Sequence, residues 1–278
     1  MPSANINGTT LAWEIVGKGE PLLMFPGLGT GMGYYSQVAS KLAENYQVIL
    51  IDPRGIGGSK CDQTEFVAQD WADDACALLD HLSLPSAHMV GSSHGGCMAM
   101  ALADTTPERV SSLTLIGAFS EINTLMEMNF RFRIALIDKV GIGPELAAHV
   151  SMWIMSHQFL ETERGRQVAA SATDMVKLND ADTYIGLNRS ILEWGRCLEG
   201  QEAEEKFTDR LSTFQVPTCA ISGDSDHFIP ARFSRLIADN VPGAEYHEIK
   251  DCGHIPVMEK PKETVALISA FVDKHSAK

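Results

Sequence analysis

The stretch Gly91-Ser92-Ser93-His94-Gly95 sets two hydroxyls and an imidazole between glycines, with the spacing G-x-S-x-G centred on Ser93. It follows an apolar run that predicts a strand and opens a segment that predicts a helix. In that context a sharp turn can expose a nucleophilic serine, because the flanking glycines let the neighbouring chain approach closely. The spacing indicates Ser93 and leaves Ser92 as the variable position. The alternative is a glycine-rich turn without a catalytic role. Only a suitable general base and acid elsewhere in the chain can distinguish the two.

A serine nucleophile needs a general base. His94 follows Ser93 directly, and adjacent side chains at a helix start diverge, so we expect only its backbone amide to act, in an oxyanion hole. His254, in DCGHIPVMEKP, lies just past the last predicted strand, where a loop can reach over the sheet edge. SGDSDHFIP, after the preceding strand, offers Asp224 and Asp226 as the acid that orients the base.

Two other segments of the sequence have features of a different kind of site. The DSDH segment resembles a metal site, but no second cluster of His, Cys or Asp at ligand spacing accompanies it. GLGTGMG, residues 27–33, has the glycine density of a dinucleotide loop without the G-x-G-x-x-G spacing. We therefore expect neither a metal nor a cofactor.

The residues that could do chemistry follow short apolar runs, which predict buried strands. Strands are predicted at 9–16, 21–25, 46–52, 87–92, 110–118, 216–223 and 244–250. Helices are predicted at 34–44, 65–82, 94–104, 231–240 and 262–274. Strands that alternate with helices indicate an α/β fold with a mostly parallel sheet covered on both faces.

The alternation stops after residue 118, and only helical patterns follow, near 124–139, 144–157, 161–177 and 181–198. Such an insertion is far too long for a plain loop. The sequence therefore predicts a core domain formed by 1–118 and 207–278, and a helical cap at 119–206.

Composition limits the partners. The 278 residues carry a net charge of −14, which argues against nucleic acid. Residues 21–40 and 81–103 contain no Asp, Glu, Lys or Arg, but both are broken by glycine or proline and carry serines, so neither predicts a membrane span. No signal peptide is visible at MPSANING, and we expect a cytoplasmic protein. The sequence leaves the oligomeric state open.

Taken in order, the motifs resemble those of the α/β-hydrolase family over essentially the whole chain. FPGLG at 25–29 matches the family's oxyanion loop, DPRGIGGS at 52–59 its D-x-R-G-x-G-x-S turn, and GHIPVMEKP its G-H and E-x-P segment. GDSDHFIP matches G-x-x-D-x-x-x-P, which selects Asp226. The resemblance implies a Ser93, Asp226 and His254 triad in the family's chain order, with the amides of Leu28 and His94 as the oxyanion hole. Pro26 departs from the family pattern, which commonly has histidine there.

The resemblance implies hydrolysis of a carboxylic ester or lactone by water through an acyl-enzyme on Ser93. Within the family, the chain is similar to 3-oxoadipate enol-lactonase-like hydrolases and related bacterial carboxylesterases. Two rivals stay open: a carbon–carbon bond hydrolase or cofactor-free perhydrolase with the same triad, and a non-catalytic ligand receptor on the same scaffold.

The predicted cap is rich in large apolar side chains, which either pack the cap or line a pocket beneath it. We expect the substrate to contact Met126, Phe130, Met152, Trp153 and Trp194. A neutral, largely apolar ester or lactone is therefore expected. The opposite expectation, an anionic substrate, would need a cationic anchor, for which the cap offers Arg131, Arg133, Arg189 and Arg196.

Overall fold

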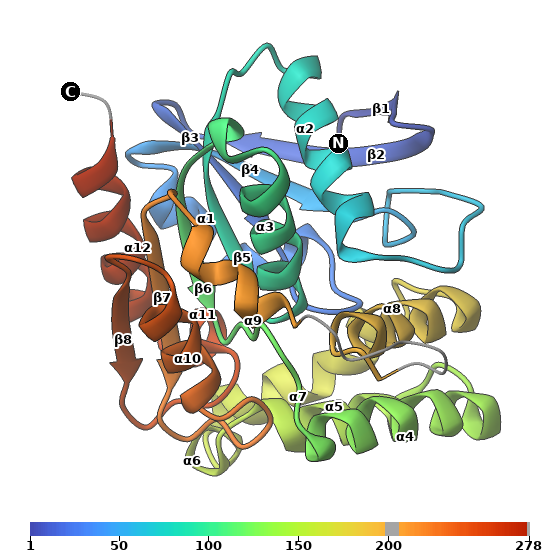
Figure 1. Ribbon diagram of the computed structural model, residues 1–278. Helices are drawn as coiled ribbons and strands as arrows, with labels where there is room; N and C mark the ends of the chain where they lie inside the picture. Colours follow the sequence, from blue (N-terminus) through green and yellow to red (C-terminus); the bar gives the residue numbers. More distant parts are fainter. Residues whose placement is uncertain (198–205, 277–278) are drawn as a thin grey trace.

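The computed structural model describes residues 1–197 and 206–276. Their strands form one eight-stranded sheet in the order β1-β2-β4-β3-β5-β6-β7-β8 (Figure 1). The first two strands pair antiparallel, as do β2 and β4, and the remaining neighbours are parallel. The strands are β1 (Ser3–Ile6), β2 (Thr9–Val16), β3 (Glu20–Phe25), β4 (Tyr46–Asp52), β5 (Ala87–Ser92), β6 (Val110–Ile116), β7 (Thr218–Gly223) and β8 (Glu245–Ile249).

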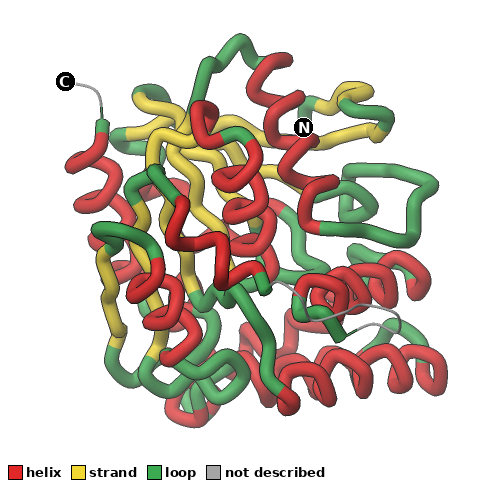
Figure 2. Tube along the Cα trace, in the orientation of Figure 1, coloured by secondary structure: helices red, strands yellow, loops and turns green. Residues whose placement is uncertain are grey.

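Helices cover the sheet on both faces, which the tube view shows as red layers around the yellow strands (Figure 2). One face carries α1 and α12, and the other carries α2, α3 and α10. The strands β5 and β7 are buried at every position, in agreement with the mainly apolar and small residues that they contain. The helices are α1 (Ser36–Leu42), α2 (Ala68–His81), α3 (His94–Thr105), α10 (Arg232–Asn240), α11 (Pro256–Glu259) and α12 (Pro261–His275).

The predicted helical insertion is present between β6 and β7, and it lies over the carboxyl ends of the parallel strands (Figure 1). The mostly parallel, doubly covered sheet with an inserted helical region is thus confirmed. The insertion contains α4 (Thr124–Val140), α5 (Pro144–Ile154), α6 (His157–Leu160), α7 (Glu163–Val176) and α8 (Ala181–Trp194), and α9 (Phe207–Arg210) leads back to the sheet. The division into a core and a cap at 119–206 stays a prediction.

Many predicted boundaries shift by one to three residues, and two helices of the insertion differ more clearly from the prediction. The helix predicted at 144–157 is interrupted, because Met155 is extended and the Ser156 hydroxyl accepts a hydrogen bond from the Phe159 amide, which starts a new helix. The helix predicted at 181–198 ends at Trp194, and its last predicted residue, like the rest of 198–205, lies outside the described residues.

Over residues 1–197 and 206–276, no helix combines the length and apolar character needed to cross a bilayer.

Candidate active site

Ser93 occupies a sharp turn between β5 and α3. Its backbone has φ 54° and ψ −120°, a strained conformation for a residue with a side chain. The glycines make the turn possible: a Cβ on Gly91 would lie 2.4 Å from the carbonyl oxygen of Gly95, and one on Gly95 would lie 2.3 Å from that of Phe25. Ser93 lines a cavity together with residues of the inserted helices α4, α5 and α8.

Ser92, the other serine of the motif, lies elsewhere. Its side chain is fully buried, and its hydroxyl bonds to the Tyr34 hydroxyl at 2.7 Å. Burial raises the pKa of the Tyr34 phenol, so that group stays protonated and the pair is a neutral structural contact. The structure therefore separates the two serines as the G-x-S-x-G spacing predicts.

Asp226 and His254 come together from the loops after β7 and β8. The His254 Nδ1 and the Asp226 Oδ2 lie 2.7 Å apart, and Oδ1 of the same carboxylate accepts the amides of Phe228 and Ile229 at 3.0 and 2.8 Å. The imidazole Nε2 is buried without a hydrogen-bond partner among the described residues. Ser93 and His254 line the same cavity, although their side chains are not hydrogen bonded to each other. Such bonds are often long before a substrate binds.

The loop that carries His254 is held in place by Glu259, the glutamate of the E-x-P segment. The Glu259 carboxylate accepts the Gly253 amide at 3.0 Å, together with the amide and hydroxyl of Ser156 at 3.0 and 2.6 Å. The amide of His254 also donates to the carbonyl of Ile154 at 2.9 Å. The loop of the candidate base is thus tied to the inserted helices.

The predicted oxyanion amides belong to two elements that meet at Ser93. Leu28 follows β3 and lines the cavity, and His94 is the first residue of α3, where a helix leaves its amides without internal partners. Neither amide donates a hydrogen bond elsewhere in the described chain. The loop after β3 is fixed from the inserted helices, because the Asn179 side chain donates to the Gly29 carbonyl at 2.7 Å.

The D-x-R-G-x-G-x-S turn has a supporting position. The Asp52 carboxylate accepts the amides of Met32 and Gly58, both at 2.8 Å, and so joins this turn to the loop after β3. Arg54 makes a bidentate contact with Asp74 through Nε at 2.7 Å and Nη2 at 2.5 Å. The Asp52–Met32 bond thus supports the loop that carries Leu28, and the Arg54–Asp74 contact ties the turn after β4 to α2.

The side chain of His94 turns away from Ser93, as the sequence predicts for its place at the helix start. Its ring lies edge-on to Trp71 with centroids 4.8 Å apart, and its Nε2 contacts the Ser190 hydroxyl of α8. Burial lowers its pKa to about 3, so the imidazole is neutral at ordinary pH. This geometry leaves only the His94 amide near the candidate nucleophile.

Of the five residues expected to contact substrate, Phe130 is the one that lines the cavity with Ser93. Met126, one helical turn earlier on α4, is fully buried in the core beneath it. Trp153 packs near the Phe228 ring, with centroids 6.4 Å apart, and Phe228 itself lines the cavity.

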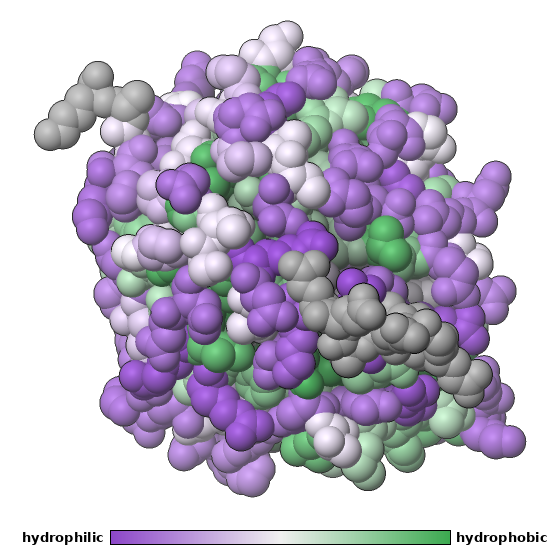
Figure 3. Space-filling model, viewed as in Figure 1, coloured by the Kyte–Doolittle hydropathy of each residue, from purple (hydrophilic) through white to green (hydrophobic). Residues whose placement is uncertain are grey.

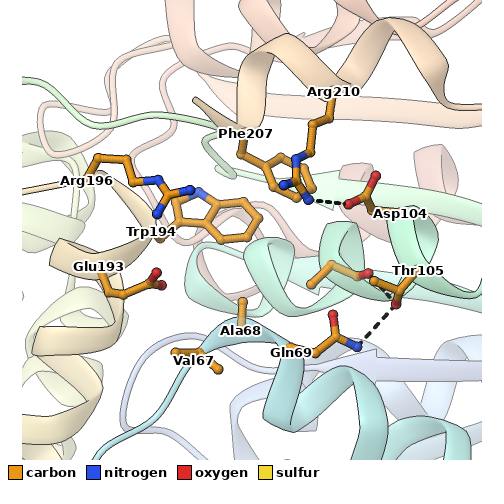
Figure 4. A pocket seen from close by; sticks show the side chains of 11 residues that line it. Val67, Ala68, Gln69, Asp104, Thr105, Glu193, Trp194, Arg196, Phe207 and Arg210 are labelled. Atoms are coloured by element: carbon orange, nitrogen blue, oxygen red, sulfur yellow. Dashed lines mark hydrogen bonds and ion pairs between the residues drawn. The ribbon is translucent and has the colours of Figure 1, made fainter. Parts of the chain in front are cut away.

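Met152 and Trp194 are placed away from this cavity. Met152 is 63% exposed on α5. Figure 3 shows apolar residues at the surface along the lower edge of the molecule, where the inserted helices lie. Trp194 stacks on Phe207 at 4.1 Å in a separate pocket, beside the Arg210–Asp104 ion pair (Figure 4). Helix α5 turns Met152 outward, and the end of α8 lies against α9, so neither side chain roofs Ser93.

The four arginines of the insertion also divide. Arg131 and Arg189 are exposed and pair with glutamates, and Arg196 lines the pocket of Figure 4. Arg133 alone of the four lines the cavity of Ser93, and its side chain is 2% exposed. The sequence motifs alone do not distinguish Arg133 from the other three arginines.

The chain belongs to the α/β-hydrolase family. The family model described as alpha/beta hydrolase fold matches residues 20–261, which span the strands and loops that carry Ser93, Asp226 and His254.

Individual relatives are distant but cover the chain. A protein of Azorhizobium caulinodans provisionally named carbamate hydrolase RutD is 29% identical over 90% of this chain and 89% of its own length. The enol-lactonase of Burkholderia xenovorans LB400 superposes with a TM-score of 0.86 at 23% identity, over 98% of this chain and all of its own. A thermophilic esterase of Thermogutta terrifontis gives 0.85 at 22% identity, over 99% and 100%. These two structures establish the shared fold.

Proposed function

We propose that the chain is a serine hydrolase that cleaves a carboxylic ester or lactone through an acyl-enzyme on Ser93. The observation that carries the proposal is a single cavity lined by Ser93 and His254, with His254 held through Nδ1 by Asp226. Since Nδ1 is bonded to the carboxylate, Nε2 is the atom that takes the serine proton. The strained backbone of Ser93 further supports a role beyond packing.

In the proposed cycle, His254 removes the proton of the Ser93 hydroxyl as Oγ bonds to the substrate carbonyl carbon. Asp226 stabilises the imidazolium, and the amides of Leu28 and His94 donate to the oxyanion, each worth about 2.7–4 kcal/mol in related sites. Collapse breaks the carbon–oxygen bond, and His254 gives its proton to the leaving oxygen. Water then attacks the acyl group with the same base, and the acid is released.

The bond that is cleaved is the part of the proposal that needs chemical evidence, because the same triad would also serve carbon–carbon bond hydrolysis or perhydrolysis. A substrate panel should therefore set esters and lactones of increasing size beside a β-diketone, and beside acetate with hydrogen peroxide. We expect turnover of the esters and lactones only.

The test of the nucleophile is covalent labelling with a fluorophosphonate, followed by intact-mass and peptide mapping. We expect a single adduct on Ser93, absent in Ser93→Ala, which should also lose all turnover of an activated ester. Ser92→Ala is the matched control and should keep both the label and most of the turnover. A label on Ser92, or turnover retained by Ser93→Ala, would overturn the proposal.

A further inference from the structure

Arg133 is a buried cation without a carboxylate partner. Its side chain is 2% exposed, and it forms no ion pair with any described residue. An arginine keeps its charge under all ordinary conditions, so burial of this group needs compensation. Burial lowers its pKa, and the Tyr184 hydroxyl is the neighbour that opposes this shift.

The aromatic neighbours of Arg133 compensate only part of that burial. The guanidinium carbon lies 4.7 Å from the centre of the Phe228 ring and 5.4 Å from that of Phe130. Rings of this kind interact with the positive charge, but they offer no acceptor to the N–H groups. Both Nε and Nη2 of Arg133 are buried without a hydrogen-bond partner among the described residues.

Nε and Nη2 form one edge of the guanidinium, and another arginine of the chain shows what this edge binds. In Arg54 the same two atoms hold the two carboxylate oxygens of Asp74, at 2.7 and 2.5 Å. This parallel pair of donors matches the geometry of a carboxylate. The unpartnered edge of Arg133 therefore has the shape and charge of a carboxylate-binding site.

The position of Arg133 relates this edge to the reaction. The Phe228 ring contacts both groups, and its centroid lies 5.3 Å from that of the His254 ring. Since the guanidinium carbon is 4.7 Å from the same ring centroid, it lies no more than about 10 Å from the centre of the imidazole. A carboxylate on Arg133 and a carbonyl carbon at Ser93 would thus be separated by only a few carbon atoms.

We propose that Arg133 binds a carboxylate of the substrate, so that the preferred ester or lactone is a monoanion whose carboxylate lies a few atoms from the scissile carbonyl. This inference rests on the proposed hydrolase function and specifies its substrate class. It replaces the neutral, apolar substrate expected from the composition of the cap. Arg133 supplies binding and orientation, while the bond-breaking steps stay with Ser93 and His254.

The test compares substrates that differ in one charge. The monoethyl esters of succinate, glutarate and adipate are compared with the corresponding diethyl esters. The O-acetyl derivatives of glycolate and 3-hydroxypropanoate are compared with the ethyl esters of the same O-acetylated acids. We expect at least one anionic member to exceed its neutral partner in kcat/KM by about 10-fold or more. Arg133→Gln should lower kcat/KM for that anion by about 100-fold and reverse the preference. Arg133→Lys should restore part of it.

Arg131→Gln is the matched control, because Arg131 lies on the same helix but is exposed and paired with Glu127 at 2.8 Å. We expect it to leave the preference for the anion unchanged. A neutral preference in both substrate series, or an anion preference that survives Arg133→Gln, would overturn the proposal. A general loss of structure in Arg133→Gln is recognised separately, since it would lower the fluorophosphonate labelling rate and both members of each pair alike.

A binding measurement separates this inference from the hydrolase proposal. Calorimetric titration of Ser93→Ala with glutarate should show binding that is lost when Arg133→Gln is added. If Ser93→Ala still hydrolysed the diethyl esters, the proposed function would fail while the titration still reported on Arg133. If glutarate and the neutral diethyl ester bound equally well with and without Arg133, the anchor would be excluded while the hydrolase proposal stood.

Discussion

The imidazole of His94 meets the hydroxyl of Ser190 at 3.0 Å, so its ring contacts a helix of the insertion instead of the serine beside it in sequence. The Ser190 hydroxyl has a second bond, to the Leu187 carbonyl at 2.7 Å, and that bond requires no histidine. This arrangement gives His94 a packing role through its ring and leaves its amide available for the oxyanion hole that we propose.

His254→Ala should lower kcat for an activated ester by about four to six orders of magnitude, because triad members act as a unit. His94→Ala should lower it by less than about 10-fold, since the mutation keeps the backbone amide. Steady-state kinetics with both variants measures the difference. Comparable losses would give the His94 side chain a chemical role.

We expect the free energy of unfolding to decrease as the pH is lowered, because His94 is buried in its neutral form. Its folded pKa, about 3, is below the ordinary value of 6.5, so the unfolded state takes up the proton first. The contribution of the neutral ring is therefore complete above about pH 6.5 and is lost by about 1.4 kcal/mol per pH unit as pH falls toward 3. Urea unfolding of the wild type and His94→Phe between about pH 7.5 and pH 4.5 should show the variant gaining relative stability at the acid end. A constant difference would contradict this.

Asp226→Asn should be far more damaging than Asp224→Asn. An asparagine at 226 would favour the wrong imidazole tautomer, a change that costs about 10⁴-fold in kcat in the serine proteases. The Asp224 side chain is instead bonded to Ser225 at 3.0 Å and has no contact with His254. Kinetics of the two variants, with far-ultraviolet circular dichroism as a folding control, distinguishes them, and equal losses would mean that the acid is misassigned.

Glu259→Gln should weaken the support of the His254 loop. One acceptor oxygen becomes an amide group that cannot accept the Gly253 or Ser156 donors, and an unpaired buried donor costs about 1–3 kcal/mol. We expect a loss of that size in the free energy of unfolding and a lower kcat. Glu263→Gln, exposed in the next helix, is the control, and identical behaviour of the two variants would show that the carboxylate bonds contribute nothing.

The strands and the Ser93 turn could be predicted because their signals are local. β4 and β5 are apolar runs with ends set by the loops that follow, and the glycines at 91 and 95 are required by contacts of the turn itself. The position of the acid could not be predicted from local signals alone, because Asp224 and Asp226 both follow the same strand. Only the family motif G-x-x-D-x-x-x-P selects Asp226.

The cavity lining could not be predicted, because it depends on which face each inserted helix turns inward. On α4 a signal was nevertheless present. One buried face of α4 carries residues spaced three or four positions apart, namely Met126, Phe130, Arg133 and Ile137. Arg133 is the one charged residue among them. A lone arginine on an apolar helix face indicates a buried cation, and this pattern would have distinguished Arg133 from Arg131.

The inserted helices reach the loop of each predicted catalytic group, and this determines how far the two parts could be exchanged between relatives. If the insertion were replaced with another helical segment, three groups of the sheet domain would lose their hydrogen-bond partners. They are the Gly29 carbonyl, the His94 imidazole and the His254 amide. A chimera in which the segment between β6 and β7 is exchanged would therefore form the sheet, but its candidate active-site loops would be misplaced unless the new segment also supplied these three contacts. The three contacts are Asn179 to Gly29, Ser190 to His94, and Ile154 to His254.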